Sequence, residues 1–517
     1  MLRFWKKNRF PVHPAILAGV LFVITLGVCT ALQVQPSFPD PDSFYHAKFS
    51  QLLAQRGAST EFPWLSATSL RYQFVDHHFL YHLLLIPFVS FGDPLWGIKA
   101  ATAIFAGLML VAFYFFLRSL QVRGAFWYAL FLLTVNPLLF RINLAKAQPL
   151  VLAWLFLCLY FLFKRQPLPL LFGAFLYSWL YGGWLVLLGT VVLTVLLTQT
   201  RQHPLRQLFS LHRAGRVAGR LNLELLFSAF VGIGLGLLLH PYSPGILEFT
   251  WQQAFRIGVV GYQRVIGVGS EWYPYGLLSL VRDAAPFLAL LLAGVLSFLA
   301  QRKNRSTVSL VLALLTAIFF VMTLRSRRYV EYLMPFGVAF SAVALTGWWE
   351  QHAKQFRSVS PRVRRALIAL VILLFIPLAW RDGQAVYQQY VAGRPLQTYA
   401  PAARWLADHT PEGSIVFHSD WDEFPHLFYY NHHNYYIVGL DPSFLYIQNP
   451  ELHRLYVAVT TGVRSEQLSA IIHSAFGASY VFVDRKDNAA FGYNLATDKQ
   501  FELVYEDAQA RVYQVKP

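Results

Sequence analysis

The chain has 517 residues, of which 56% are hydrophobic and only 13% are charged, so most of it must lie in lipid rather than in water. Its two cysteines, Cys29 and Cys158, lie inside apolar runs, which excludes a disulfide framework and a Cys/His zinc motif. The net charge of +17 arises before residue 381, because the remainder of the chain carries more acidic than basic residues. A nucleic-acid partner is therefore not expected.

The N-terminal segment combines basic residues with an apolar run near 14–33, which we interpret as a retained signal anchor with a cytoplasmic N-terminus. Short basic loops follow at 118–123, 164–165, 201–220, 302–305 and 354–365, and an odd number of spans places all of them in the cytoplasm. We therefore predict a polytopic α-helical protein of the bacterial inner membrane with about 11 to 13 spans. The spans are expected near 14–33, 97–117, 125–141, 149–163, 167–181, 183–199, 223–241, 284–301, 306–324, 329–348 and 366–380.

Two apolar runs do not have the length of a single transmembrane helix. The run 167–199 is too long for one helix, since about 20 residues cross the hydrocarbon core. We expect a break at the sequence Tyr181-Gly182-Gly183. The run 78–92 is short and follows several histidines, so we place it on the outer membrane surface as an interfacial helix.

This topology divides the chain into a transmembrane domain at 1–380 and an extracytoplasmic, periplasmic domain at 381–517. The transmembrane domain has large outer loops at 34–96 and 242–283. The C-terminal domain alternates short β-rich runs with helical stretches, which is typical of an α/β fold. The strands are expected at 414–418, 435–440, 480–484, 501–505 and 511–515, and the helices near 400–409, 450–460 and 464–475.

The first outer loop carries two carboxylates just after the first span. Ser43 can cap a helix that contains His46 and ends at Gly57, so Asp40 and Asp42 fall at the positive end of that helix. Carboxylates in this position can hold a divalent cation or accept a developing positive group. The alternative is that both residues only cap a surface helix.

Asp42 followed by Tyr45-His46-x-Lys48 and then by Gly57 resembles the first acidic motif of the GT-C superfamily of membrane glycosyltransferases. The resemblance is nearest to the catalytic subunit of oligosaccharyltransferase. It implies a catalytic Asp in the first outer loop, an odd number of spans and a C-terminal domain outside the membrane. By the same resemblance, Lys48 is expected to bind the donor.

Three further segments resemble short motifs of that superfamily. Ser270-Glu271-Trp272 is similar to a motif whose Glu contacts the acceptor and the metal. Arg327 and Arg328, which open a span, are similar in position to an Arg that binds the pyrophosphate of the donor. Trp421-Asp422 is similar to part of an acceptor-binding motif in the C-terminal domain.

The superfamily has a second acidic pair at the outer start of the fourth span, and this chain has Ala145-Lys146-Ala147-Gln148-Pro149 there instead. A metal site for Mg²⁺ or Mn²⁺ would therefore draw on other residues, or there is no metal. The resemblance leaves Asp40, Asp42, His46, Asp76 and His77 as the candidate ligands.

Other polar groups have competing interpretations. His78 and His82 share one helix face, a spacing that suits zinc or phosphate, but we interpret them as the polar face of an interfacial helix because no Glu accompanies them at helical spacing. Glu271 could pair with an arginine of its own loop, such as Arg264. Asp422, which lies among several acids and histidines, could do no more than start the next helix.

The function implied by the resemblance is transfer of a sugar or oligosaccharide from a polyprenyl-phosphate or polyprenyl-diphosphate donor in the membrane to a protein or glycan acceptor outside. Asp42 would be the base, and Glu271 would take part in catalysis. Two alternatives stay open. One is a monophosphate-donor enzyme that modifies a lipid or glycan, and the other is a non-catalytic membrane scaffold derived from such an enzyme. A transporter is disfavoured because the acidic residues lie in outer loops rather than within spans.

Overall fold

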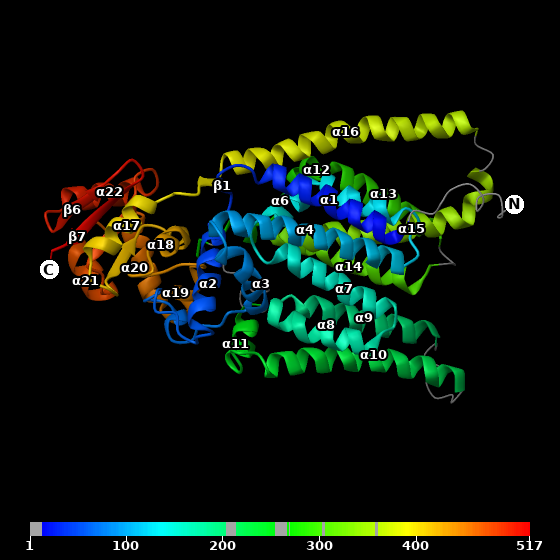
Figure 1. Ribbon diagram of the computed structural model, residues 1–517, viewed down its shortest axis with the longest axis horizontal. Coiled ribbons are helices and arrows are strands. Elements are labelled where there is room, and N and C mark those ends of the chain that lie inside the picture. Colours follow the sequence, from blue (N-terminus) through cyan, green and yellow to red (C-terminus); the bar gives the residue numbers. More distant parts are fainter. Residues whose placement is uncertain are drawn as a thin grey trace.

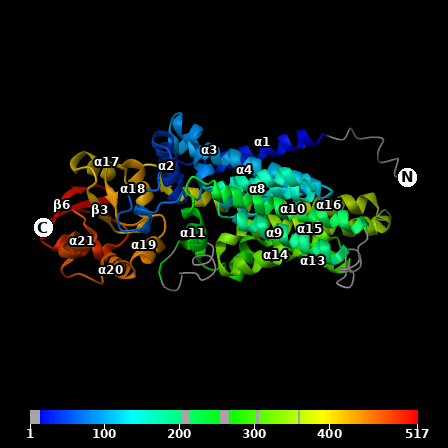
Figure 2. The ribbon, with the colours of Figure 1, turned by 90° about the horizontal axis from the view of Figure 1, so that it is seen from below.

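The computed structural model describes residues 13–202, 213–253, 266–267, 269–301, 305–356 and 360–516. Long helices lie side by side at one end of the molecule, and the C-terminal α/β domain lies at the other end (Figure 1). The short helices of the first outer loop and the helix α11 (Gly245–Trp251) lie between these two parts in both views (Figure 2). This architecture confirms the predicted fold class of a helical membrane protein with a C-terminal sheet domain.

The bundle helices overlap the predicted spans because each contains an apolar run, and some of them continue beyond the predicted bounds into charged sequence. Their bounds are α1 (Pro14–Leu32), α4 (Pro94–Ser119), α7 (Gln148–Phe163), α8 (Pro167–Leu180), α9 (Trp184–Gln202), α10 (Arg213–Leu238), α13 (Ala285–Ala300), α14 (Thr307–Arg325), α15 (Val330–Phe356) and α16 (Pro361–Val391). The expected break between α8 and α9 at Tyr181 is present.

Not all of these helices are long enough to cross a membrane without a bend or a tilt. Within the described residues, four helices qualify by length and composition, or up to six if each of two bent pairs counts as one span. Shorter apolar helices, such as α7 and α8, accompany them. The predicted number of 11 to 13 spans therefore stays a prediction.

The run 125–141 is not the single straight helix that we expected. It forms α5 (Ala125–Phe131), the 3-10 turn η2 (Leu132–Thr134) and α6 (Asn136–Asn143), with a bend of 81° between the two parts. Pro137 lies in the first turn of α6, and a proline in this position has no N–H with which to continue the preceding helix. The bend redirects the chain so that the end of α6 lies near the outer loops.

Helices α8 and α10 pack with their backbones close together. A Cβ atom on Gly232 would lie 2.3 Å from the carbonyl oxygen of Leu171, and one on Gly236 would lie 2.1 Å from the hydroxyl of Ser178. Small residues of this kind allow close helix contact in a membrane, where apolar burial alone does not drive association. These two glycines therefore determine the distance between the two helices.

The first outer loop contains β1 (Ser37–Phe38), α2 (Asp42–Arg56), the turn η1 (Ser69–Arg71) and α3 (Phe79–Ser90). The expectation that Ser43 caps α2 is wrong, because the helix begins one residue earlier. The carboxylate of Asp40 accepts the N–H of Asp42 at 2.9 Å instead. Gly57 ends the helix with a φ of +73°, as predicted.

The C-terminal domain contains a five-stranded sheet in the order β4-β3-β5-β7-β6. Its strands are β3 (Ile415–His418), β4 (Tyr435–Tyr436), β5 (Tyr480–Asp484), β6 (Phe501–Glu506) and β7 (Ala510–Val515). The pairs β3–β4 and β3–β5 are parallel, and the remaining pairs are antiparallel. The helices of this domain are α17 (Ala400–His409), α18 (Phe424–Tyr430), α19 (Ser443–Gln448), α20 (Pro450–Thr460), α21 (Leu468–Phe476) and α22 (Ala489–Thr497).

The first outer loop is joined to the C-terminal domain by backbone pairing. The N–H of Ser66 donates to the carbonyl of Tyr436 at 2.7 Å, and the N–H of Tyr436 donates to the carbonyl of Trp64 at 2.8 Å. A second pairing joins β1 to β2 (Arg394–Pro395), just after the end of α16. The loop therefore extends the edge of the sheet at β4 and holds the domain over one end of the bundle.

Candidate active site

A cavity of about 530 Å³ lies where the predicted first outer loop, the C-terminal domain and the adjoining ends of the bundle helices meet. Most of the site residues predicted from the sequence line it. They are Asp40, Asp42, His46, Asp76, His77, Glu271, Arg328, Trp421 and Asp422. Residues separated by almost 400 positions in the chain are thus brought to one place.

The two carboxylates of the first loop are bound by one ammonium group. Nζ of Lys146 lies 2.7 Å from a carboxylate oxygen of Asp40 and 2.8 Å from one of Asp42. Lys146 lies in the turn between α6 and α7 and is only 8% exposed. Burial raises the pKa of Asp40 to about 6, although Lys146 opposes that shift.

Glu271 lies in the turn η5 (Ser270–Trp272) and is held by two arginines. Arg141 of α6 donates to one of its oxygens at 2.6 Å, and Arg328 donates to the other at 3.2 Å. Burial opposes ionisation of Glu271, but Arg328, Lys146 and Arg141 together outweigh it and hold its pKa well below the usual range. Glu271 is therefore an anion at neutral pH.

The two arginines have further partners. Arg141 also binds Glu331 at 2.7 Å, and this pair is almost fully buried. Arg328 donates to the hydroxyl of Tyr181, and its guanidinium lies 4.8 Å from the centre of the Trp272 ring. Since Tyr181 is the residue at the break between α8 and α9, that break contributes a side chain to the site.

The histidines of the first loop form a buried chain rather than an exposed face. Asp76 binds Nδ1 of His82 at 2.8 Å, and Nε2 of His82 lies 2.8 Å from Nδ1 of His46. His82 is fully buried, so the interpretation of its helix face as an exposed interfacial surface is wrong. If Nδ1–H of His82 donates to the carboxylate of Asp76, Nε2 of His82 can accept the Nδ1–H of His46, and Nε2 of His46 then carries no hydrogen.

The C-terminal domain supplies the 3-10 turn η7 (Trp421–Glu423) to the cavity. A capping box closes this turn: the side chain of Asp420 accepts the N–H of Glu423, and the side chain of Glu423 accepts the N–H of Asp420 at 2.9 Å. Asp422 is therefore not the capping residue. Burial and the neighbouring charge of Asp420 raise the pKa of Asp422 to about 6.

Lys48 and Arg327 do not line this cavity. Lys48 follows His46 by two positions on α2, so it points away from the face that His46 and Asp42 share. It lies 5.5 Å from the centre of the Tyr429 ring and lines a separate cavity of about 720 Å³. Lys48 therefore lies outside the cavity that contains Asp42, and its role in donor binding stays a prediction.

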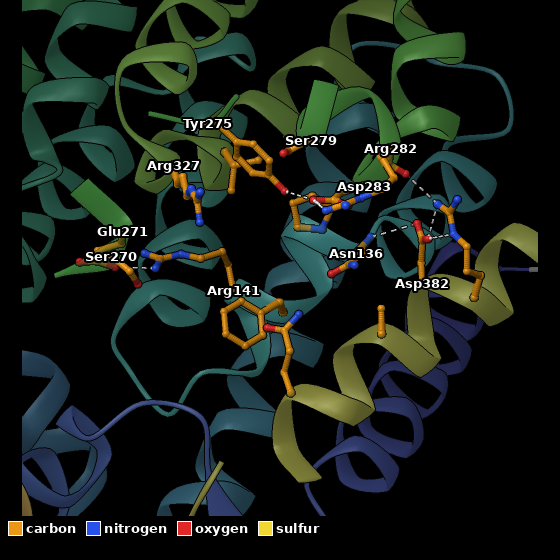
Figure 3. Close-up of a pocket in the computed structure, with 16 residues that line it drawn as sticks. Asn136, Arg141, Ser270, Glu271, Tyr275, Ser279, Arg282, Asp283, Arg327 and Asp382 are labelled. Atoms are coloured by element: carbon orange, nitrogen blue, oxygen red, sulfur yellow. Dashed lines mark hydrogen bonds and ion pairs between the residues drawn. The ribbon is translucent and has the colours of Figure 1, made fainter. Parts of the chain in front are cut away.

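Arg327 lines a second cavity of about 660 Å³ on the other side of Arg141 and Glu271 (Figure 3). The helices α6, α12 (Leu277–Asp283) and α16 border this cavity. Arg141 and Glu271 lie at one end of it, and Asp283 and Asp382 lie further along. Arg327 donates to the carbonyl of Pro274 at 3.3 Å and lies near the ring of Tyr275.

Two residues that the sequence analysis did not select are central to the site. Arg141 falls at the end of an expected span, and Lys146 belongs to the stretch that replaces the second acidic pair. A buried arginine at the end of an apolar run is a signal that could have identified Arg141, because such a charge needs a partner. The proposed partner of Glu271, Arg264, lies outside the described residues, as do parts of the basic loops at 201–220, 302–305 and 354–365.

The candidate metal ligands do not fit a divalent cation well. Asp40 and Asp42 already bind an ammonium group, Asp76 binds His82, and His46 binds the other nitrogen of His82. Within the described residues, no group of three or more His, Cys, Asp or Glu side chains is placed to hold a metal ion. A divalent cation prefers about six oxygen ligands. Most of the side chains named here already bind a cation or a hydrogen-bond donor of the protein.

Comparison with solved structures identifies proteins that share the fold of this chain. No family model matches the sequence, and no curated protein matches it. The archaeal oligosaccharyltransferase AglB from Archaeoglobus fulgidus, solved with an inhibitory peptide and a dolichol-phosphate, has a TM-score of 0.67 at 15% identity over 90% of this chain and 69% of its own. ArnT from Cupriavidus metallidurans, bound to undecaprenyl phosphate, has a TM-score of 0.56 at 16% identity over 96% and 97% of the two chains.

The arabinofuranosyltransferase AftD from Mycobacteria also matches, with a TM-score of 0.56 at 14% identity, over 97% of this chain and 40% of its own. All three are GT-C glycosyltransferases. The expected resemblance is confirmed at the level of the fold: this chain has the architecture of those enzymes over most of its length.

Proposed function

We propose that this chain, which has the GT-C fold, is a membrane glycosyltransferase that moves a sugar from a polyprenyl-phosphate or polyprenyl-diphosphate donor to an acceptor on the outer side of the membrane. The observation that carries the proposal is the cavity between the first outer loop, the C-terminal domain and the bundle. It combines Asp42, Glu271, Arg328 and Trp421 in one pocket of about 530 Å³. A pocket with convergent charges at a junction of domains is typical of an active site.

The chemistry follows from the groups present. The hydroxyl or amide of the acceptor attacks the anomeric carbon, and the bond from that carbon to the phosphate oxygen breaks, with its electron pair staying on the phosphate. The proton of the acceptor goes to Asp42, which lies at the positive end of α2. Positive charge near the departing phosphate lowers the barrier, because negative charge develops there in the transition state.

The donor phosphate is best accommodated near the arginines that separate the two cavities. Arg328 lines the first cavity and Arg327 lines the second, only one residue apart in the turn η6 (Arg327–Tyr329). The charge of Arg328 is already shared with Glu271, whereas the guanidinium of Arg327 contacts a carbonyl and an aromatic ring. Arg327 is therefore the cation better placed to receive a phosphate.

The acceptor is expected on the side of the C-terminal domain, where Trp421 and Asp422 line the same cavity as Asp42. An indole ring beside carboxylates can stack on a sugar or a peptide and hydrogen-bond its polar groups. The proposal includes a cytoplasmic N-terminus and a periplasmic C-terminal domain in a bacterial inner membrane, because the basic loops favour that orientation.

The test is transfer of labelled sugar from the polyprenyl-linked pool of the cell, in membranes that carry the wild type, Asp42→Asn or Glu271→Gln at matched protein levels. We expect Asp42→Asn to reduce transfer by about 100-fold or more, since a positioned base contributes roughly that much. Glu271→Gln should also reduce transfer, because it removes the anion that aligns Arg141 and Arg328.

Matched controls are Asp408→Asn and Glu248→Gln, which remove exposed carboxylates elsewhere on the outer side. Full transfer by both site variants would refute the proposal. No transfer by the wild type, with the donor pool verified, would favour the scaffold, in which paired acids only hold the fold together. A labelled lipid as the product, rather than a labelled protein or glycan, would favour the alternative enzyme that modifies a lipid.

A further inference from the structure

The ammonium group of Lys146 lies between the two carboxylates of the first loop. This lysine comes from the turn between α6 and α7, which is the segment that carries no acidic pair in this chain. Its Nζ binds Asp40 at 2.7 Å and Asp42 at 2.8 Å, and the residue lines the cavity. The cation is therefore part of the polypeptide and comes from a segment far from the acids it binds.

A divalent ion would compete poorly for these carboxylates. It would have to displace Nζ or sit within a few ångströms of it, where two like charges repel strongly. Removal of the ammonium group would not free other ligands, because Glu271 is held by Arg141 and Arg328, and Asp76 is held by His82. Each acid of the cavity named here thus has its own protein cation or hydrogen-bond donor.

We infer that Lys146 is a tethered cation that replaces a divalent metal in this site, so that transfer proceeds without one. The inference rests on the proposed function. Two carboxylates and one ammonium leave one net negative charge, and the proton that Asp42 takes from the acceptor neutralises it. With a divalent ion in place of the ammonium, the same proton would leave an excess positive charge. A lysine therefore suits a pair of acids of which one must accept a proton.

The bend between α5 and α6 places Lys146 at the site. The bend of 81° between α5 and α6 brings the end of α6 and the following turn toward the outer loops. Arg141, at the end of α6, binds Glu271, and Lys146, in the turn, binds the two aspartates. One short segment thus supplies positive charge to both groups of acids in the cavity.

The first measurement is a titration of the full-length protein with Mn²⁺ in detergent. The protein is first treated with a chelator, and binding is monitored by electron paramagnetic resonance. We expect no Mn²⁺ binding at this site by the wild type at 100 μM. Any binding that remains at that concentration should be the same in Asp42→Asn. Lys146→Ala should bind Mn²⁺ at least about tenfold more tightly than the wild type, because two carboxylates then lack a cation. Wild-type binding below 100 μM that is lost in a folded Asp42→Asn variant would overturn the inference.

The second measurement is sugar transfer in the presence of a chelator. The wild type should keep its activity within about twofold, and Lys146→Ala should lose about 100-fold or more, as for removal of a positioned charge. Lys146→Arg should restore part of the loss, and Lys499→Ala, at an exposed position of the C-terminal domain, should change nothing.

Loss of wild-type transfer on chelation, with recovery on addition of Mn²⁺, would refute the inference while supporting the proposed function. If the wild type transfers no sugar under any condition, the proposed function fails, and the Mn²⁺ titration alone still decides whether the site takes a metal or holds its own cation. The two failures are therefore distinguishable.

Discussion

Arg141 binds two acids at once, Glu271 at 2.6 Å and Glu331 at 2.7 Å, and is only 6% exposed. Removal of a buried cation leaves uncompensated charges behind, which costs far more than the pair contributes. We expect Arg141→Met to destabilise the protein by about 3–5 kcal/mol, measured as a lower temperature of thermal unfolding in detergent.

A suitable control for Arg141→Met is Arg123→Met. Arg123 also pairs with a glutamate, Glu350, at 3.4 Å, but both side chains are more than half exposed. An exposed pair contributes at most about 1 kcal/mol. Equal unfolding temperatures for the two variants would contradict the structural account of Arg141.

Asp422 is expected to make stability depend on pH. Burial and the charge of Asp420 raise its pKa to about 6, against about 3.9 for an unfolded chain. The folded state then binds the proton more tightly, so the charge of Asp422 destabilises the fold increasingly as the pH rises from 4 to 6, and fully above 6. Asp422→Asn should raise the unfolding temperature at pH 8 and leave it unchanged below pH 4.

The measurement for Asp422→Asn is a pair of unfolding curves at pH 8 and pH 4, with the wild type alongside. A variant that is less stable than the wild type at pH 8 would show that Arg394, which opposes the shift, dominates the site. The sign of the difference therefore decides which neighbour controls Asp422.

Among the elements, the first outer loop and strand β4 depend on each other. The backbone of Ser66 donates to Tyr436, and a proline has no N–H with which to make that bond. Ser66→Pro should loosen the loop from the C-terminal domain, open the cavity and increase cleavage of the loop by added protease several-fold. Ala58→Pro, at an exposed position of the same loop, should leave the cleavage rate unchanged.

Helix α6 shows where sequence reasoning stops at the scale of an element. Hydropathy alone predicts one span at 125–141, because an average over a run does not detect a change of direction. The proline at 137 signals a boundary, but the angle of 81° depends on contacts with other elements, such as the bond from the N–H of Asn136 to Asp382 of α16. Without that bend, Arg141 and Lys146 would not lie in the cavity.

For the whole molecule, the orientation in the membrane can be tested with introduced cysteines. The two native cysteines are fully buried and should stay silent toward a membrane-impermeant maleimide. Lys499→Cys in the C-terminal domain should react from the outer side of intact inner-membrane vesicles of native orientation. Arg123→Cys, in a basic loop, should react only after the membrane is opened. The opposite labelling pattern would reverse the predicted orientation.

Local properties of the sequence determined the class of protein, the approximate helix bounds and the α/β character of the C-terminal domain. Hydropathy, helix-breaking residues and strand periodicity each act over a few residues, so they can be recognised without knowledge of the fold. The sequence also indicated Asp42, Glu271, Arg328 and Asp422 through the superfamily resemblance, and the structure places all four around one cavity.

Only the tertiary structure decided which of these groups meet and which cations they meet. Lys48 is adjacent to the motif in sequence but lies on the other face of α2, whereas Lys146 is about 100 positions away and binds both aspartates. Similarly, His82 belongs to a buried chain of hydrogen bonds rather than to a membrane surface. Electrostatic pairing depends on distance in space, and the folding of distant segments onto one another sets that distance.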